Sequence, residues 1–97
     1  MKITTHKKFD KAFVKLTVDQ RTAVKQAIVA FETDRLDPNL RDHALKGKMK
    51  GLRAFSAAWD LRVIYREEGG FITIILLDAG THSQPNTPVR DNSGRVR

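Results

Sequence analysis

The stretch LRAFSAAWDLRVIYREEGGFITIILL, residues 52–77, decides the fold. Its side chains alternate with a period of two over residues 52–56 and again over 61–66, and this period is typical of β-strands. Residues 57–60 lie between the two alternating segments and are expected to form the turn of a β-hairpin. The first half of the stretch therefore predicts two antiparallel strands.

The second half of the same stretch adds a third strand. Two glycines within residues 67–70 (EEGG) indicate a turn. Residues 71–77 (FITIILL) are nearly all apolar, which predicts a strand that is covered on both faces. Gly80 is expected to end this strand, so the chain contains a three-strand antiparallel meander from residue 52 onward.

The residues before the meander predict one strand and two helices. Residues 1–5 hold β-branched threonines and one isoleucine, which favour a short strand. Apolar residues recur at helical spacing in residues 9–16 and again in 24–31. Thr17 and Gln20 match a capping box, so the second helix should begin there. An N-terminal strand, a two-helix hairpin and the meander make an α+β domain with the helices on one sheet face.

The composition limits what this domain can be. The chain has 97 residues, a hydrophobic fraction of 40% and no cysteine, so it predicts one domain without disulfides, a zinc ribbon or a catalytic thiol. Its longest apolar run, within residues 71–77, is far shorter than the roughly 20 residues of a membrane-spanning helix. Residues 1–6 show no apolar signal region. We therefore expect a cytoplasmic protein that contacts no membrane.

The positive charge of the chain indicates an anionic partner. The net charge is +7, and small basic proteins commonly bind polyanions. Residues 41–66 alone hold seven basic against two acidic residues. The alternation predicts that Arg53 and Arg62 share one sheet face, with a lysine loop (Lys46, Lys48 and Lys50) at its edge. An ordinary solvated face is the alternative, but glycines in the loop allow a phosphate backbone to approach closely.

Three residues are candidates for proton transfer. His43 lies at the entrance to the lysine loop, and His82 follows the most apolar strand; histidine titrates near neutral pH. Asp60 lies in the expected hairpin turn, where its carboxylate could orient or activate a proton-transfer partner. A purely structural role is the more frequent one for each of the three. Trp59 is expected to pack in the hairpin or core, and to stack on a base if it is exposed.

These residue types suit RNA cleavage without a metal. The sequence has no Walker loop and no cluster with metal-ligand spacing. In RNA, the 2′-hydroxyl attacks the adjacent phosphate once a base removes its proton. Cations then stabilise the added negative charge, and an acid protonates the leaving 5′ oxygen. Histidine or carboxylate groups together with Arg and Lys suffice for this chemistry.

Four segments carry a family resemblance. They read RDHALKG at residues 41–47, KGLR at 50–53, WDLRVIY at 59–65 and GTHS at 80–83. Together they resemble the RelE/ParE toxin superfamily, and most closely its YafQ-like mRNA interferases. The resemblance runs from residue 1 to residue 84 and includes the order of the elements. It implies a RelE-like fold of the microbial-RNase type, and a type II toxin that cleaves mRNA in the ribosomal A site without a metal or other cofactor.

The resemblance also implies roles for individual residues. His43, Asp60 and His82 match acid–base residues of the YafQ-like branch, and Arg62 matches the arginine that other RelE-like enzymes place on the scissile phosphate. The implied RNA-binding residues are Lys46, Lys48, Lys50, Arg53 and Ser83. The implied partners are a cognate antitoxin and mRNA on the ribosome, with contacts to rRNA. A toxin–antitoxin hetero-oligomer that binds operator DNA is a further expectation.

Two features depart from the family pattern. Ser56 stands where the YafQ-like branch often has a further histidine. No aromatic residue follows Phe71, although the family usually carries one near its C-terminus. The toxin domain is expected to comprise residues 1–84. Residues 85–97 are basic and poor in apolar side chains, so they predict a flexible tail.

Two other functions fit the same residues. A ParE-like toxin inhibits DNA gyrase by binding, and shares the fold and a basic surface, but it needs no acid–base residues. A plain RNA- or DNA-binding module needs only the positive charge, and predicts strongly salt-dependent binding. An antitoxin is expected to cover Arg53, Arg62 and His82, or to displace an element near them.

Overall fold

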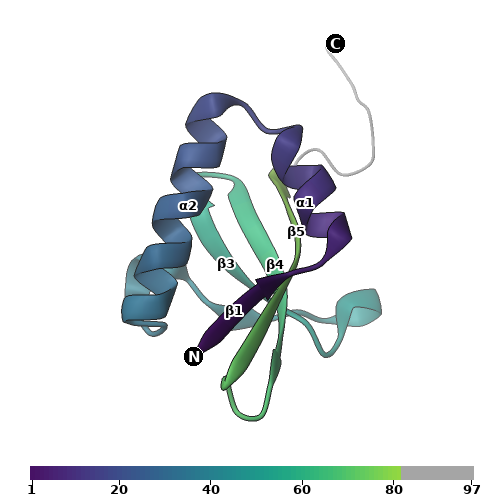
Figure 1. Cartoon of the computed structure of the whole chain (residues 1–97). Helices are drawn as coiled ribbons and strands as arrows, with labels where there is room; N and C mark the ends of the chain where they lie inside the picture. Colours follow the sequence, from purple (N-terminus) through teal and green to yellow (C-terminus); the bar gives the residue numbers. More distant parts are fainter. Residues whose placement is uncertain (82–97) are drawn as a thin grey trace.

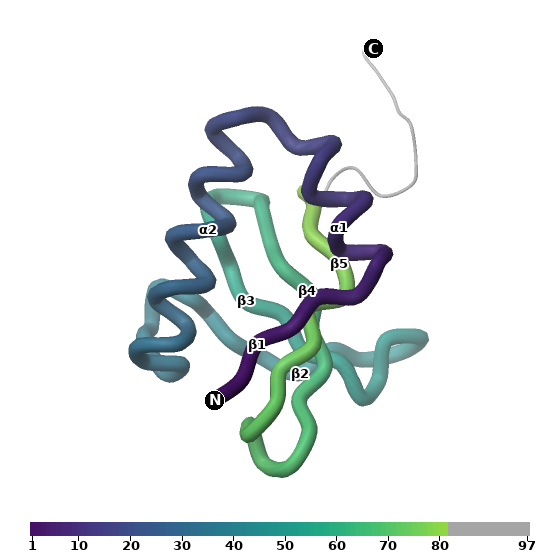
Figure 2. Tube along the Cα trace, in the orientation of Figure 1, coloured from purple at the N-terminus to yellow at the C-terminus, as the bar shows by residue number. Residues whose placement is uncertain are grey.

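Five strands form one mixed sheet in the computed structural model, which describes residues 1–81. They are β1 (Lys2–Thr5), β2 (His43–Ala44), β3 (Arg53–Ala58), β4 (Leu61–Glu68) and β5 (Thr73–Thr81). Their order is β1-β5-β4-β3-β2, with β1 parallel to β5 and the other pairs antiparallel. Figure 2 shows the purple β1 running beside the yellow-green β5. The predicted N-terminal strand and three-strand meander are confirmed.

Two helices follow β1 and cover one face of the sheet (Figure 1). They are α1 (Lys7–Val14) and α2 (Val18–Thr33). The predicted capping box is present, because the Thr17 hydroxyl accepts a hydrogen bond from the Gln20 N–H at 3.1 Å, and the Gln20 side chain accepts one from the Thr17 N–H at 2.9 Å. These bonds satisfy backbone donors that a helix start leaves without partners. Within the described residues, no helix is long and apolar enough to cross a bilayer.

The hydrophobic core lies between the helices and the sheet. Phe31 of α2 stacks on Phe55 of β3 with ring centroids 4.7 Å apart, and meets Tyr65 of β4 edge-on at 5.1 Å. All three rings are fully buried. Because side chains alternate along a strand, Arg62 points away from this core, to the opposite face of the sheet.

The strand register corrects the prediction that Arg53 and Arg62 share one sheet face. Arg53 pairs with Tyr65, whereas Arg62 pairs with Ser56. Directly paired residues place their side chains on the same face, so Arg53 lies on the helix-covered face and Arg62 on the open one. The physical reason is that Phe55, an aromatic residue with a large apolar surface, is buried against α2. Arg53 lies two positions earlier on β3, so its side chain is on the same face.

Strand β5 also differs from its predicted bounds and burial. It begins at Thr73, because Phe71 has a φ of 71° and lies outside the extended region. Gly80 does not end the strand, since it pairs with Arg62 of β4 and the strand continues to Thr81. One face of β5 is buried and the other is half-buried, because both helices lie on the same side of the sheet.

Short regular elements occupy the segment between α2 and β3. It holds two short 3₁₀ helices, η1 (Pro38–Leu40) and η2 (Gly47–Met49), with β2 between them. Asp37 caps η1, because its carboxylate accepts a hydrogen bond from the Asn39 N–H at 2.9 Å. Strand β2 has only two residues, so it is too short to show the alternation of apolar and polar side chains that predicts a strand. It nevertheless fixes His43 at the edge of the sheet.

Candidate active site

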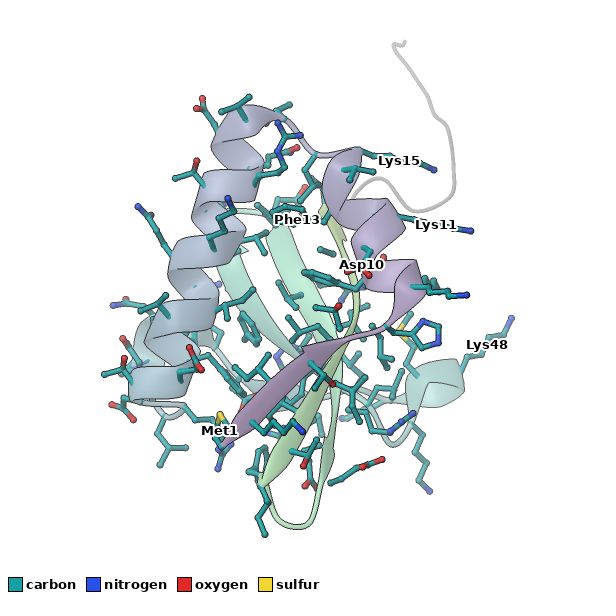
Figure 3. The ribbon with its side chains drawn as sticks, in the orientation of Figure 1. Met1, Asp10, Lys11, Phe13, Lys15 and Lys48 are labelled. Atoms are coloured by element: carbon teal, nitrogen blue, oxygen red, sulfur yellow. The ribbon has the colours of Figure 1, made fainter. Side chains whose placement is uncertain are left out.

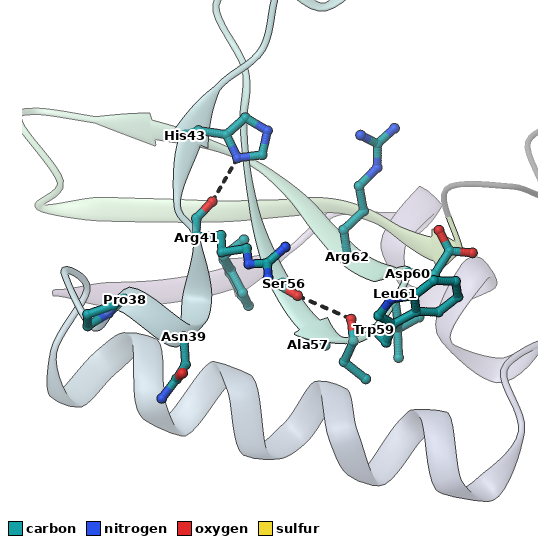
Figure 4. A pocket seen from close by; sticks show the side chains of 12 residues that line it. Pro38, Asn39, Arg41, His43, Ser56, Ala57, Trp59, Asp60, Leu61 and Arg62 are labelled. Carbon is teal, nitrogen blue, oxygen red and sulfur yellow. Dashed lines mark hydrogen bonds between the residues drawn. The ribbon is translucent and has the colours of Figure 1, made fainter.

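An open groove of about 720 Å³ lies along the part of the β3 edge that β2 leaves uncovered. Its walls come from η1, from β2 and from the hairpin between β3 and β4 (Figure 4). His43, Asp60 and Arg62 all line the groove, so the fold brings together three of the four residues predicted to be catalytic. The other lining residues are Pro38, Asn39, Arg41, Phe55, Ser56, Ala57, Ala58, Trp59 and Leu61.

The geometry around His43 fixes which ring nitrogen faces outward. Its Nδ1 lies 2.7 Å from the carbonyl oxygen of Arg41 (Figure 4). A carbonyl oxygen only accepts hydrogen bonds, so Nδ1 carries the proton and donates it to Arg41. In the neutral ring, Nε2 therefore keeps its lone pair, and because the side chain is exposed this nitrogen is accessible to a substrate. The neutral ring of His43 thus presents Nε2 to the groove as a hydrogen-bond acceptor.

Asp42, the residue before His43, has a buried carboxylate that holds this segment in place. The Asp42 side chain is 5% exposed and accepts hydrogen bonds from Arg35 at 2.7 Å, from Arg53 at 3.3 Å and from the Tyr65 hydroxyl. The Arg35 guanidinium in turn lies 3.7 Å above the Phe71 ring. Asp42, which directly precedes β2, thereby connects it to the segment that follows α2, to β3 and to β4. This network also explains why Arg53, predicted to bind RNA, turns toward the protein.

Tyr65 gives the network a measurable pH dependence. Burial raises the pKa of its hydroxyl above the ordinary value of 10.0, and the hydrogen bond to Asp42 raises it further. Above about pH 10 the unfolded chain has released this proton while the folded chain still holds it. The unfolded state then binds fewer protons, so the free energy of unfolding falls as the pH rises through this window.

This sign leads to a testable expectation. Urea unfolding between roughly pH 8 and pH 11 should show a smaller loss of stability for Tyr65→Phe than for the wild type, because phenylalanine has no proton to release. Both proteins carry the same lysines, so lysine titration is matched. Parallel curves over this range would show that Tyr65 remains free to ionise in the folded state.

The hairpin between β3 and β4 positions Trp59 and Asp60. Asp60 has a φ of 63° and closes a two-residue turn, in the left-handed conformation that Asp adopts more readily than most residues. A register shift between Ser56 and Ala58 precedes the turn, where the Ser56 hydroxyl donates to the Ala58 carbonyl at 3.1 Å. Trp59 is 92% exposed. The expectation that Trp59 packs in the hairpin or core is therefore wrong. Its ring is exposed, which is the case in which it is expected to stack on a base.

Arg62 supplies a positive charge to the groove. It lies on the same face of the sheet as His43, because His43 pairs with Ala54 and Ala54 pairs with Ile64, two positions along β4 from Arg62. Figure 4 shows the two side chains projecting to the same side. Among residues 1–81, Arg62 forms no salt bridge. Its guanidinium is available for an anion.

The remaining predicted site residues lie outside this groove. Lys46, Lys48 and Lys50 are exposed around η2, which follows the edge strand β2, so the loop lies at the edge of the sheet as predicted. Strand β5 approaches the groove, because Thr81 pairs with Leu61, next to Asp60. His82 and Ser83 follow Thr81 but lie outside the described residues, as does the predicted tail.

The family model described as the bacterial toxin of type II toxin-antitoxin systems, YafQ, matches residues 1–85. The chain belongs to the YafQ toxin family. No curated protein sequence matches it. A copper-bound mutant toxin from Helicobacter pylori is 32% identical, with a TM-score of 0.68, and the match covers 86% of this chain and 96% of that one.

Two other solved structures share the fold of this YafQ-family toxin. YafQ from E. coli is 22% identical with a TM-score of 0.67, and the match covers 84% of this chain and 92% of that one. The archaeal RelE-RelB complex from Pyrococcus horikoshii OT3 is 19% identical with a TM-score of 0.65, over 86% of this chain and 96% of that one. The RelE-like α+β fold expected from the sequence is confirmed.

Residues 1–81 of this toxin hold no cluster of metal-binding side chains that would correspond to the copper named for the Helicobacter pylori protein. Across that range, no group of three or more His, Asp or Glu side chains lies close enough together to hold an ion. His6 caps α1 and His43 begins β2, and His43 shares the groove with Asp60 and Arg62. The arginine in this groove favours an anion over a cation.

A second, smaller groove of about 460 Å³ separates α1 from β5. Lys8, Lys11 and Lys15 line it, and Lys8 lies 3.8 Å from Asp78 in a partly exposed pair. Figure 3 shows Lys11 and Lys15 projecting outward from α1. In the sequence these lysines lie away from most of the apolar stripe in residues 9–16, and no sequence pattern indicates a groove beside them.

Proposed function

We propose that this YafQ-family toxin is a metal-independent endoribonuclease that cleaves mRNA on the ribosome by attack of a 2′-hydroxyl on the adjacent phosphate. The observation that supports the proposal is the groove itself. It gathers a proton acceptor from β2, a carboxylate from the hairpin turn and a guanidinium from β4. A protein that only bound its target would have no need of this combination.

Each group has a role in the proposed reaction. The outward Nε2 of His43 accepts the proton of the 2′-hydroxyl, or a neighbouring acid–base group does so in its place. The Arg62 guanidinium stabilises the charge that builds on the phosphoryl oxygens. Asp60 and His82 complete the acid–base set, one of whose members protonates the leaving 5′ oxygen. Which group is base and which is acid depends on how they couple in the loaded site.

The surroundings of the groove supply the proposed binding surface. The exposed lysines Lys46, Lys48 and Lys50 attract the phosphates of mRNA and rRNA. Arg53 and Ser83 complete the proposed RNA contacts, although Arg53 reaches RNA only if it leaves Asp42. A cognate antitoxin covers the groove and its basic rim, and toxin–antitoxin complexes occur among proteins of this fold. The hetero-oligomer would then bind operator DNA.

Primer extension on a defined mRNA in a purified translation system tests the activity. We expect cuts within codons when ribosomes are present and none when they are absent, and His82→Ala should lose these cuts. A folded wild-type protein that leaves the mRNA intact contradicts the proposal. A gyrase supercoiling assay on the same preparation then tests the binding-only alternative, in which the acid–base residues have no role.

Arg62→Ala should reduce the cleavage rate by about 100-fold, because the phosphate loses its charge-stabilising donor. Arg66→Ala is the matched control. Arg66 projects from the same strand and the same face, but it is exposed and already pairs with Glu68 at 3.4 Å. Equal losses in the two variants would mean that the charge acts only through general attraction of RNA.

A further inference from the structure

Trp59 is the single tryptophan of the chain, and its side chain is almost wholly in solvent. It is 92% exposed, whereas Phe55, the other aromatic residue of the groove, is 1% exposed. An indole ring carries a large apolar surface, so leaving it in water forgoes the stabilisation that burial of a core aromatic gives. A bound partner would recover this energy.

The hairpin holds the indole at the groove rather than letting it fold back onto the sheet. Asp60 occupies the left-handed region at a φ of 63°, which closes the turn tightly after Trp59. The register shift between Ser56 and Ala58 bends the strand just before the turn, and bulges next to functional sites commonly re-aim a side chain in this way. Trp59 lines the same groove as His43 and Arg62 (Figure 4).

The neighbours of the indole indicate what kind of ligand it meets. The groove that Trp59 lines also holds a guanidinium, a carboxylate and an imidazole. A hydrophobic helix of a partner protein would need a wider apolar patch than a single ring among charged side chains. Single-stranded nucleic acid fits better, because cations follow its phosphates while each base stacks on a flat ring.

We propose that Trp59 is a stacking platform for one base of single-stranded RNA, next to the phosphate that Arg62 contacts. This inference rests on the proposed function, and adds to it the residue that positions the nucleotide. Stacking uses the π-face that every base has, so the platform favours larger bases but excludes none. Sequence preference at this nucleotide is therefore weak.

The single tryptophan makes the test direct, because all indole fluorescence comes from Trp59. The probe is a short 2′-O-methyl oligoribonucleotide, which has no free 2′-hydroxyl and is not cleaved by the proposed reaction. We expect it to quench the fluorescence as it binds. An oligonucleotide of the same length with abasic residues carries the same charge and should not quench. Equal quenching by the two probes would overturn the proposal.

Variants give an independent measurement. With a dye-labelled 2′-O-methyl probe, fluorescence anisotropy should show Kd about 5- to 150-fold higher for Trp59→Ala, the range for loss of one stacked base. Trp59→Phe should bind within a few-fold of the wild type, because it keeps an aromatic face. Trp59 lies at an exposed turn, so both variants should retain the wild-type circular dichroism spectrum. Unchanged Kd in folded Trp59→Ala would overturn the proposal.

These measurements separate the platform from the proposed nuclease activity. The probe contains no cleavable bond and no ribosome is present, so quenching is expected even if the toxin cuts no mRNA. Conversely, a toxin that cuts mRNA on ribosomes but whose fluorescence responds to neither probe retains the proposed function and lacks the platform. If purified antitoxin alone shifts the emission while RNA does not, the indole serves the antitoxin, and the RNA proposal is overturned.

Discussion

Replacing Asp42 by asparagine should lower the free energy of unfolding by about 3 kcal/mol, a large share of the stability of a small domain. The carboxylate is 5% exposed and is the common partner of Arg35, Arg53 and Tyr65. Asparagine keeps the shape but leaves two guanidinium groups without their counter-charge. These arginine side chains are 25% and 27% exposed. Because solvent screens them in part, we expect the lower end of the range for buried pairs.

Urea unfolding of the wild type and the variant measures this loss. Asp78→Asn is the matched control, since Asp78 is 35% exposed and pairs with Lys8 at 3.8 Å. Loss of this partly exposed pair should cost less than about 0.5 kcal/mol. If Asp42→Asn costs no more than Asp78→Asn, then the network does not hold β2 in place. Because Asp42 directly precedes His43, its loss would also release the proposed proton acceptor from its position.

Local sequence patterns predicted the elements that depend on local interactions. The capping box at Thr17 acts over three residues, and the apolar stripes of the helices repeat at a similarly short spacing. The period of two in the strands likewise needs only neighbouring residues. The N-terminal strand, both helices and the meander could therefore be predicted without knowledge of the tertiary structure.

Features that depend on distant partners could not be predicted in this way. In the sequence, Asp42 is visible only as one of two acidic residues that lower the net positive charge of residues 41–66. Its partners lie 7, 11 and 23 residues away. The face of Arg53 depends on which residue of β3 enters the core, and Phe55 enters it where its ring stacks on Phe31 of α2. The exposure of Trp59 depends on the turn geometry, which hydrophobicity does not encode.

The groove shows the same division. The resemblance assigned His43, Asp60 and Arg62 by position, and the residue types indicated acid–base chemistry. The sequence could not show that η1 and the uncovered edge of β3 form one concave surface around them. Nor could it show which nitrogen of His43 faces outward, because that depends on the Arg41 carbonyl.

His43→Asn should reduce the rate of mRNA cleavage by about 10²- to 10⁴-fold, the range for loss of a general acid–base group. Asparagine is polar and of similar size, but it neither accepts nor releases a proton at neutral pH. His6→Asn is the matched control, because His6 is exposed and caps α1 by accepting a hydrogen bond from the Lys8 N–H at 3.0 Å. Asparagine is a good N-cap, so this variant should cleave at the wild-type rate.

A double-mutant cycle then tests whether His43 acts together with Asp60. Asp60→Asn suits the cycle, because asparagine tolerates the left-handed backbone of this turn. Residues that serve one transition state lose little more together than the worse single variant loses alone. We therefore expect the double variant to cleave almost as fast as His43→Asn. If the losses multiply instead, the two groups act in separate steps. Only one of them would then take part in removing the proton from the 2′-hydroxyl.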